Sequence, residues 1–384
     1  MPIFDRRHFL ASGAALSSLP FTSSFSFAEG SNSQVTNSKR TGTSKEGAVA
    51  TVHPLASRAA IEAFRRGGNA IDAAAAASIM LTVVDGFNSG IGGGCLAMLR
   101  TADGKILALD GREKAPALAK PEMFYRKGKP DPKLSQVGPL AAGVPGLLAA
   151  LDRLTSSHGK LTLANGFAGA AEVASQGFVL DENYVRRLRL VAKSLKRFPP
   201  SAEILLDSGG SPWQPGHKLV QKDLGKTLTN LADKGVEWFY HGEFADVTGR
   251  FLSEQGGVMQ ASDFAEYNTV LREPINSEYR GNRVYGFPPP SSGGIHIAQM
   301  LGMLSGFDVR EIFNKSSAAG RHLLLEVMKR AMADRAYWLG DSDFAKVPRG
   351  LLDRSYLRER AVDIKLDQTS KIDSHGQPPR ADID

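Results

Sequence analysis

Cysteine is nearly absent from this sequence. The 384 residues contain one, Cys95, so no disulfide can form within the chain. Cys95 lies in an apolar run, which favours a buried structural thiol over a catalytic nucleophile. Long hydrophobic runs are missing too. The best candidate, Ala70–Val84, carries Asp72 and is too short to cross a bilayer, so we predict a buried helix and no membrane span.

Signatures of metal and serine chemistry are also missing. There is no His-Glu-x-x-His, no cysteine pair and no Gly-x-Ser-x-Gly, so we predict no metal site and no cofactor. Residues 341–343 (Asp-Ser-Asp) begin like a calcium loop but lack its glycine and its closing glutamate. His322 and Glu326 stand one helical turn apart, a spacing that usually indicates a surface contact.

Long blocks of one charge sign are missing as well. The net charge is +7, yet the densest basic stretches are residues 186–189 and residues 354–360, and the second alternates with acids. Such spacing is typical of a solvated helix face. We therefore predict no nucleic-acid partner.

What is present begins with an N-terminus that looks like an export signal. Arg6 and Arg7 precede an apolar, small-residue stretch over residues 11–27, followed by a signal-peptidase pattern. This order predicts a twin-arginine signal over residues 1–28 and a periplasmic or secreted protein. Residues 29–46 are rich in Ser, Thr, Asn and Lys, which predicts a flexible linker.

The apolar periodicity predicts helices mixed with short strands. Helices are expected over residues 56–66, 69–84, 145–154, 163–176, 183–196, 223–234 and 246–255. A short strand is expected at residues 48–51. Two apolar runs around Asp103-Gly104 predict a β-hairpin over residues 95–109. The order of helix, glycine loop and strand argues against a Rossmann nucleotide site, which needs strand, glycine loop and helix.

Two features beside this hairpin have open interpretations. Four of the five residues 90–94 are glycine, which is typical of a loop whose backbone N–H groups approach a ligand, and equally of a tight packing turn. Arg112 follows the second strand, between Asp110 and Glu113. Such an arginine most often forms a structural ion pair, although its planar guanidinium also suits bidentate binding of a substrate carboxylate.

The C-terminal half contains a stiff loop between a strand and a helix. A strand at residues 284–287 runs into Pro288-Pro-Pro-Ser-Ser-Gly-Gly294, and a helix is expected over residues 295–304 with Ser292 as its N-cap. A long helix is expected over residues 322–339. Residues 361–384 are polar and predict a poorly ordered tail.

The order of these blocks resembles the γ-glutamyltranspeptidase family. The matching stretches are residues 50–56, 67–74, 89–94, 110–116, 143–146, 221–224, 287–294 and 333–337. They include Asp110-Gly-Arg-Glu-Lys-Ala-Pro116 and the Pro-Pro-Pro-Ser-Ser-Gly-Gly loop. Several blocks are long and unusual, and together they cover residues 47–360, the expected large-subunit domain.

The resemblance implies an α+β fold, the large-subunit portion of an N-terminal-nucleophile hydrolase αββα sandwich. Family members cut themselves into a large and a small subunit, and the small subunit begins with a Thr nucleophile whose α-amine acts as the base. That Thr takes the γ-glutamyl group of a compound such as glutathione and passes it to water or an amino acid. Arg112 would bind the substrate α-carboxylate, which reverses the interpretation of Arg112 from the bare sequence. Ser291, Ser292, Gly293 and Gly294 would line the active-site wall.

The sequence departs from the family in ways that leave alternatives open. It has no Thr-Thr-His, so no catalytic residue is expected in this chain, and residue 384 lies near where the family's cut would fall. Gly111 replaces a common aromatic residue and Lys114 an apolar one, which puts substrate recognition in doubt. The expected partner is a small subunit on a separate chain. The alternatives are a truncated, non-catalytic remnant that has lost this subunit, a ligand-binding protein, and part of a β-lactam acylase-like member.

Overall fold

A computed structural model describes residues 47–372, 374–379 and 382–383. The predicted signal (residues 1–28) and linker (residues 29–46) lie outside the described residues. Among the described helices, none has the length and apolar character that a membrane-crossing helix needs.

Two helices that pack together open the described chain. They are α2 (Pro54–Arg65) and α3 (Ala70–Val84), as predicted. His53 Nδ1 accepts the N–H of Leu55 at the start of α2, and Asn69 forms a capping box with Asp72 at the start of α3. The strand predicted at residues 48–51 is wrong. Thr51 instead hydrogen-bonds Ser57 of α2, so this segment leads into the helix rather than joining a sheet.

The predicted helices up to residue 255 are confirmed, with ends shifted by at most four residues. They are α4 (Leu147–His158), α5 (Ala164–Gln176), α6 (Glu182–Leu195), α8 (Lys222–Lys234) and α10 (Glu243–Glu254). Three shorter helices were not predicted: α7 (Pro199–Leu205), α9 (Glu237–His241) and α11 (Ala261–Ala265). Their apolar faces meet in one large core with α2 and α3, which includes Phe167, Phe239 and Phe264.

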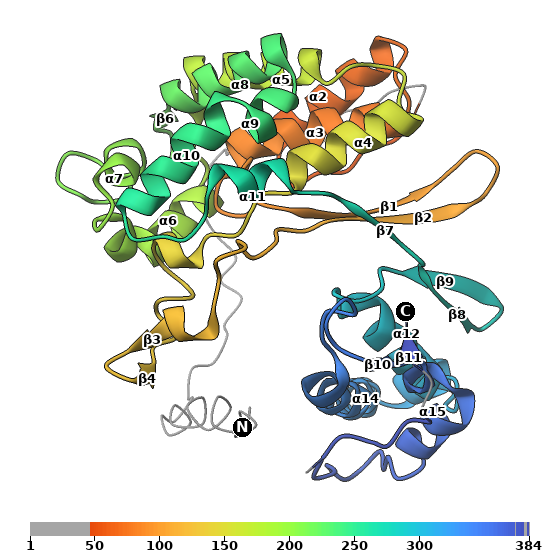
Figure 1. Ribbon diagram of the computed structural model, residues 1–384. Coiled ribbons are helices and arrows are strands. Elements are labelled where there is room, and N and C mark those ends of the chain that lie inside the picture. Colours follow the sequence, from red (N-terminus) through yellow and green to blue (C-terminus); the bar gives the residue numbers. More distant parts are fainter. Residues whose placement is uncertain (1–46, 373, 380–381, 384) are drawn as a thin grey trace, which may run out of the picture. The chain divides into compact units, whose positions relative to one another are not determined.

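This helical layer covers one face of a three-stranded antiparallel sheet in the order β1-β2-β7 (Figure 1). β1 (Cys95–Arg100) and β2 (Ile106–Gly111) form the predicted hairpin, and β7 (Val270–Arg272) adds the third strand. Leu109 of β2 packs with Ala150 and Leu154 of α4. On the other face, Leu96 and Met98 of the outer strand β1 are each 38% exposed, whereas Ala108 of the central strand β2 is buried.

The remaining strands up to residue 219 form two short ribbons. They are β3 (Tyr125–Arg126) with β4 (Lys129–Pro130), and β5 (Phe178–Val179) with β6 (Lys218–Leu219). One-turn 3₁₀ helices occur at Pro121–Phe124, Pro139–Ala141 and Arg349–Leu352.

A second core forms in the C-terminal part of the chain. The hairpin of β8 (Ile275–Tyr279) and β9 (Asn282–Gly286) packs with α12 (Gly293–Leu304), α14 (Ser317–Trp338) and α15 (Arg354–Ala361). The helix α13 (Val309–Lys315) precedes α14. The predicted strand and both predicted helices are therefore confirmed, and α14 begins five residues earlier than expected.

The prediction of a poorly ordered tail is wrong. Ile364 joins the second core, and the backbone N–H of Ser370 donates to Glu326. The Gly376 N–H donates to the buried Asp334 over 2.8 Å, and β11 (Asp382–Ile383) pairs with β10 (Val347–Pro348). The composition is polar, but these backbone donors meet carboxylates that α14 holds out of solvent. The described part of the tail is held in place because its N–H groups satisfy these buried carboxylates with hydrogen bonds.

Glu326 is part of this arrangement and is buried, not at the surface as its spacing from His322 suggested. Its side chain is 1% exposed, and its carboxylate accepts hydrogen bonds from Lys329 (2.7 Å), Arg330 (2.8 Å) and Ser370 N (3.2 Å). Burial opposes ionisation, but these hydrogen bonds outweigh it and lower the pKa of Glu326 to about 2.

We expect the second core to lose stability in acid through Glu326. A carboxyl whose folded pKa is depressed contributes stability that is present above its usual pKa of 4.5 and is lost as the pH falls toward about 2. Urea unfolding followed by near-ultraviolet circular dichroism should show the free energy of unfolding falling across this window. In Glu326→Gln the fall should be smaller. An equal fall in both proteins would contradict this role.

Candidate functional site

Arg112 lies one residue beyond β2, and its backbone is held on both sides. Its N–H donates to Asp110 Oδ1 over 2.9 Å, and its carbonyl oxygen accepts from the Tyr267 hydroxyl over 2.7 Å. Burial raises the pKa of the Tyr267 phenol, so the hydroxyl stays protonated and remains a donor. The main chain of Arg112 is therefore fixed in place by neighbouring side chains.

The guanidinium of Arg112 is held far less tightly than its backbone. The side chain is 50% exposed, and Arg112 Nε lies 3.6 Å from Glu113 Oε1, its one ion-pair partner among the described residues. An exposed pair of this length contributes about 0–1 kcal/mol to stability. The structural ion pair that the bare sequence favoured is thus weak, and most of the guanidinium donors remain open to a carboxylate ligand.

The glycine loop of residues 90–94 packs against the Arg112 segment. A Cβ on Gly94 would lie 2.7 Å from Arg112 Cα, so only glycine fits there. The Gly93 carbonyl oxygen accepts the N–H groups of Gly146 and Leu147, both over 3.0 Å. Of the two interpretations that the sequence left open, these contacts support a tight packing turn at Gly93 and Gly94.

Gly111 has a packing reason of its own. A Cβ at this position would lie 2.4 Å from the Cβ of Ala150 on α4. An aromatic residue, which the family resemblance leads one to expect, has no space here because α4 packs directly on the strand. Lys114 lies with its ammonium 5.4 Å from the centre of the Tyr267 ring, so it adds a cation beside the tyrosine that holds Arg112.

Arg272 of β7 organises this site, and the sequence analysis missed it. Its Nε donates to Asp110 Oδ2 over 2.7 Å, while its two terminal nitrogens donate to both oxygens of Asp343 over 2.9 and 2.8 Å. The Arg272 and Asp110 side chains are only 10% and 7% exposed. The hydrogen bonds from Arg272 hold the pKa of Asp343 below its usual value. Residues 341–343 therefore supply carboxylates to an arginine rather than the start of a calcium loop.

The other predicted site residues follow β9. Ser291 and Ser292 are half-buried, Gly293 is exposed and Gly294 is buried. A Cβ on Gly294 would lie 2.3 Å from the Phe287 carbonyl oxygen, so the loop folds back closely on the strand end.

The predicted N-cap by Ser292 is wrong. Ser292 has nearly helical backbone angles (φ −83°, ψ −19°) and makes no capping hydrogen bond. A capping side chain needs an extended backbone to reach the first free N–H groups. The Ser291 hydroxyl instead accepts the Gly293 N–H over 3.3 Å. Within the part of the chain that the structure describes, no hydrogen bond or ion pair joins Arg112 to Ser291–Gly294.

Few groups near Arg112 could act as a nucleophile. Cys95 is half-buried, and burial together with the Asp110 carboxylate raises the pKa of its thiol to about 11. The thiolate is therefore scarce at neutral pH. Across the described ranges, no three His, Cys, Asp or Glu side chains gather as metal ligands. The site can bind an anion through Arg112, but it offers no activated attacking group.

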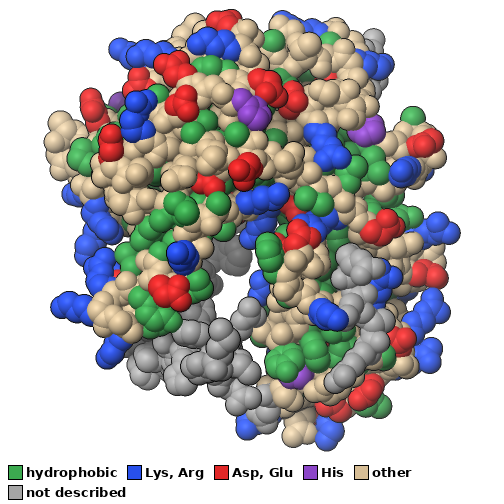
Figure 2. Space-filling view, in the orientation of Figure 1, with side chains coloured by type: hydrophobic (Ala, Val, Ile, Leu, Met, Phe, Trp, Pro, Cys, Tyr) green, Lys and Arg blue, Asp and Glu red, His purple; other side chains and the backbone are tan. Residues whose placement is uncertain are grey.

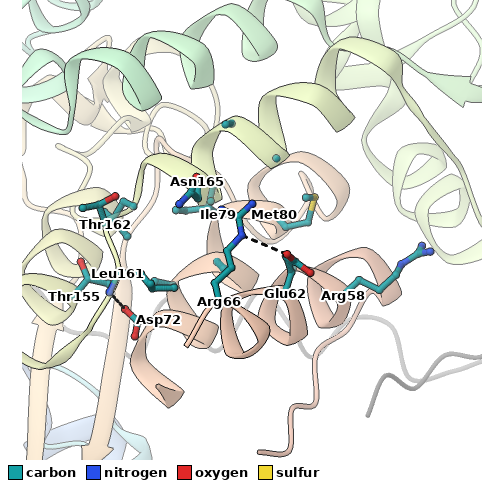
Figure 3. Close-up of a pocket in the computed structure, with 18 of the residues that line it drawn as sticks. Arg58, Glu62, Arg66, Asp72, Ile79, Met80, Thr155, Leu161, Thr162 and Asn165 are labelled. Atoms are coloured by element: carbon teal, nitrogen blue, oxygen red, sulfur yellow. Dashed lines mark hydrogen bonds and ion pairs between the residues drawn. The ribbon is translucent and has the colours of Figure 1, made fainter. Parts of the chain in front are cut away.

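A separate cavity of about 600 Å³ lies between α2, α3 and α5 (Figure 3). Ile79 and Met80 line its apolar part, and Arg58 and Glu62 lie along α2 at its side. The Asp72 carboxylate already accepts the backbone N–H groups of Lys160 and Leu161. This cavity contains none of the predicted site residues, and its buried carboxylate is fully engaged by the backbone.

The sequence matches a known family over most of its length. The family model described as gamma-glutamyltranspeptidase matches residues 56–382. The glutathione hydrolase proenzyme of Escherichia coli is 35% identical over 326 residues, which are 84% of this chain and 56% of that protein. An acylase ACY 1 proenzyme from Pseudomonas is 38% identical over 339 residues, 86% of this chain and 60% of that one. The chain thus spans somewhat more than half the length of these relatives.

The structure also matches solved ones. The γ-glutamyltranspeptidase of Helicobacter pylori superposes with a TM-score of 0.81 at 34% identity, covering 86% of this chain and 95% of the solved chain. This likeness confirms the predicted α+β class and the N-terminal-nucleophile hydrolase fold, of which the chain covers most of the large subunit.

Proposed function

The chain belongs to the γ-glutamyltranspeptidase family, and we propose that it supplies the glutamate-binding part of a γ-glutamyltransferase or glutathione hydrolase. In this reaction a Thr hydroxyl attacks the γ-carbonyl carbon of a compound such as glutathione. The amide bond breaks, the leaving amine takes a proton, and the acyl group passes to water or an amino acid. The Thr belongs to a small-subunit sequence that these 384 residues do not contain.

The observation that carries this proposal is the contrast within Arg112. Its backbone is fixed by Asp110 and Tyr267, whereas its guanidinium is half exposed and only loosely paired. A guanidinium with free donors on a fixed backbone suits bidentate binding of an α-carboxylate. This binding would orient the γ-carbonyl toward a nucleophile. Ser291, Ser292, Gly293 and Gly294 would line the wall of the same site in the assembled enzyme.

We also propose that the protein is exported, with a signal and a linker ahead of its folded domain. Residues 1–28 would act as a twin-arginine signal and residues 29–46 as a linker, which would bring the domain of residues 47–360 to the periplasm or the medium. The segment from residue 361 would lead to the point of self-cleavage. The expected partner is the small subunit with the Thr nucleophile.

A second candidate is an acylase that acts on the side chains of β-lactams. The acylase ACY 1 proenzyme is 38% identical to this chain, at least as similar as the glutathione hydrolase of Escherichia coli. Gly111 and the Lys114 ammonium near the Tyr267 ring are departures from the family pattern beside Arg112, and they could alter which substrate is bound. An acylase would bind the dicarboxylate glutarate as well as it binds glutamate.

Calorimetry of the purified chain tests both candidates. We expect saturable binding of L-glutamate and none of 4-aminobutyrate, which lacks the α-carboxylate. Arg112→Ala should weaken glutamate binding by about 1.5–3 kcal/mol, the usual contribution of a hydrogen bond to a charged group. Arg153→Ala, at an exposed arginine that bonds Thr269, is the matched control and should bind normally.

The outcomes separate the candidates. Equal affinity for glutarate and glutamate would favour the acylase. If the parent chain bound neither ligand, both candidate functions would be wrong, and the chain would be a non-catalytic remnant. If Arg112→Ala still bound glutamate as the parent does, the role given to Arg112 would be wrong.

A further inference from the structure

The outer face of α6 has an unusual distribution of charge. Leu190 lies at the centre of this face and is 74% exposed. Arg186, Arg187 and Lys193 stand three or four residues from Leu190, so their side chains surround it at helical spacing. Beside them Val191 is 44% exposed. An apolar centre with a cationic rim therefore faces solvent.

Among the described residues, no acidic side chain forms an ion pair with the cations of this face, although the Arg187 charge partly offsets the rise in the pKa of Asp85 that burial causes. The exposed basic residues from α6 to the start of α7 are Arg186, Arg187, Arg189, Lys193, Lys196 and Arg197. None of the ion pairs formed among the described residues includes any of them. Arg186 donates to Asn183, and Arg187 lies 5.7 Å from the centre of the Phe87 ring. Lys and Arg side chains gather along the edge of the molecule where Figure 1 places α6 (Figure 2).

Folding alone does not account for this pattern. Tyr184, Val185 and Leu188 on the inner face are buried and anchor the helix in the first core. The outer face adds no packing, and like charges three or four residues apart destabilise a helix slightly. A merely solvated face would interleave acids with the cations, as residues 354–360 do, whereas the one acid of α6 is Glu182 in its first turn. The exposed Leu190 and Val191 have no role in such a face.

We propose that the outer face of α6 binds the surface of membranes that contain acidic phospholipids. The cations would contact the anionic headgroups, and Leu190 and Val191 would enter the boundary between headgroups and acyl chains. A nucleic acid fits less well, because the exposed positions of α6 carry no aromatic side chain on which a base could stack. This surface is independent of the γ-glutamyl site and does not rest on the proposed activity.

Vesicle flotation of the full chain tests this surface. The protein should float with vesicles of phosphatidylcholine and phosphatidylglycerol, but not with pure phosphatidylcholine, and added salt should weaken the binding. Each Lys or Arg near an acidic membrane contributes about a fivefold change in partition. The triple variant Arg186→Gln, Arg187→Gln, Lys193→Gln should therefore partition about a hundredfold less.

Two further variants separate the lipid surface from general charge attraction. Lys105→Gln, Arg283→Gln, Arg310→Gln removes three exposed cations elsewhere and should change partition only slightly. Leu190→Ser keeps every charge and should lower partition severalfold. Equal losses in both triple variants would overturn the proposal. So would an unchanged Leu190→Ser, or binding of a single-stranded RNA homopolymer that matches the vesicles and is lost in the same triple variant.

Discussion

The purified 384-residue chain is expected to release no p-nitroaniline from γ-glutamyl-p-nitroanilide above the uncatalysed rate. The family's reaction requires an N-terminal Thr with its own α-amine as base, and this sequence has no Thr-Thr-His. Removing a nucleophile from an enzyme of comparable mechanism lowers kcat by about 10⁶-fold. Cys95 cannot substitute for it, because burial raises the pKa of its thiol to about 11.

Complementation is the decisive control for this prediction. A small subunit from a related γ-glutamyltranspeptidase, produced together with this chain, should restore release of p-nitroaniline if the two fit. Arg112→Ala in that complex should abolish the restored rate, whereas Arg153→Ala should leave it unchanged. Turnover by the chain alone, retained in Cys95→Ala, would contradict the assignment of the nucleophile to another sequence.

Sequence patterns correctly predicted the helices and the hairpin that are specified by residues close together in the chain. The helices α2 and α3 follow from runs of apolar residues at helical spacing, and the β1-β2 hairpin follows from Asp103-Gly104 between apolar runs. The turn brings Gly111 and Arg112 to the end of β2, as expected. These elements need only neighbours in sequence to be specified.

Predictions failed where distant residues decide the structure. The tail was expected to be disordered from its polar composition, but Ser370 and Gly376 find buried carboxylates on α14. The composition of the tail does not reveal that it can hydrogen-bond buried carboxylates more than forty residues earlier in the sequence. Ser292 failed for a different reason, since its backbone is already helical and its hydroxyl cannot reach the N–H groups that it was expected to cap.

The largest omission was the partnership of Arg272. Its three-residue strand β7 carries no periodic signal, and its partners Asp110 and Asp343 lie 162 and 71 residues away. The acids at positions 341 and 343 were noted in the sequence. They suggested a calcium loop because Arg272, which pairs with them, lies far away in the sequence. The one available signal would have been a basic residue, Arg272, directly after the short apolar pair Val270 and Leu271.

Arg272→Met is expected to lower the free energy of unfolding by about 3–5 kcal/mol, the cost of leaving a buried charge without its partner. Asp110 is 7% exposed and would lose its 2.7 Å bond from Arg272 Nε, while Asp343 would lose a bidentate partner. Urea unfolding at about pH 7 measures this change. Because Asp110 also holds the Arg112 N–H, glutamate binding should weaken in the folded variant.

A second substitution distinguishes a stranded charge from lost packing. If the cost of Arg272→Met comes from the uncompensated Asp110 carboxylate, adding Asp110→Asn should recover part of the stability, since the amide oxygen can still accept the Arg112 N–H. If the cost comes from packing alone, the two losses should add. Arg153→Ala, whose exposed guanidinium bonds the Thr269 backbone, should cost about 1 kcal/mol or less. If Arg272→Met lost no more stability than Arg153→Ala, Asp110 would keep its position without Arg272. The backbone of Arg112 would then be held by Tyr267.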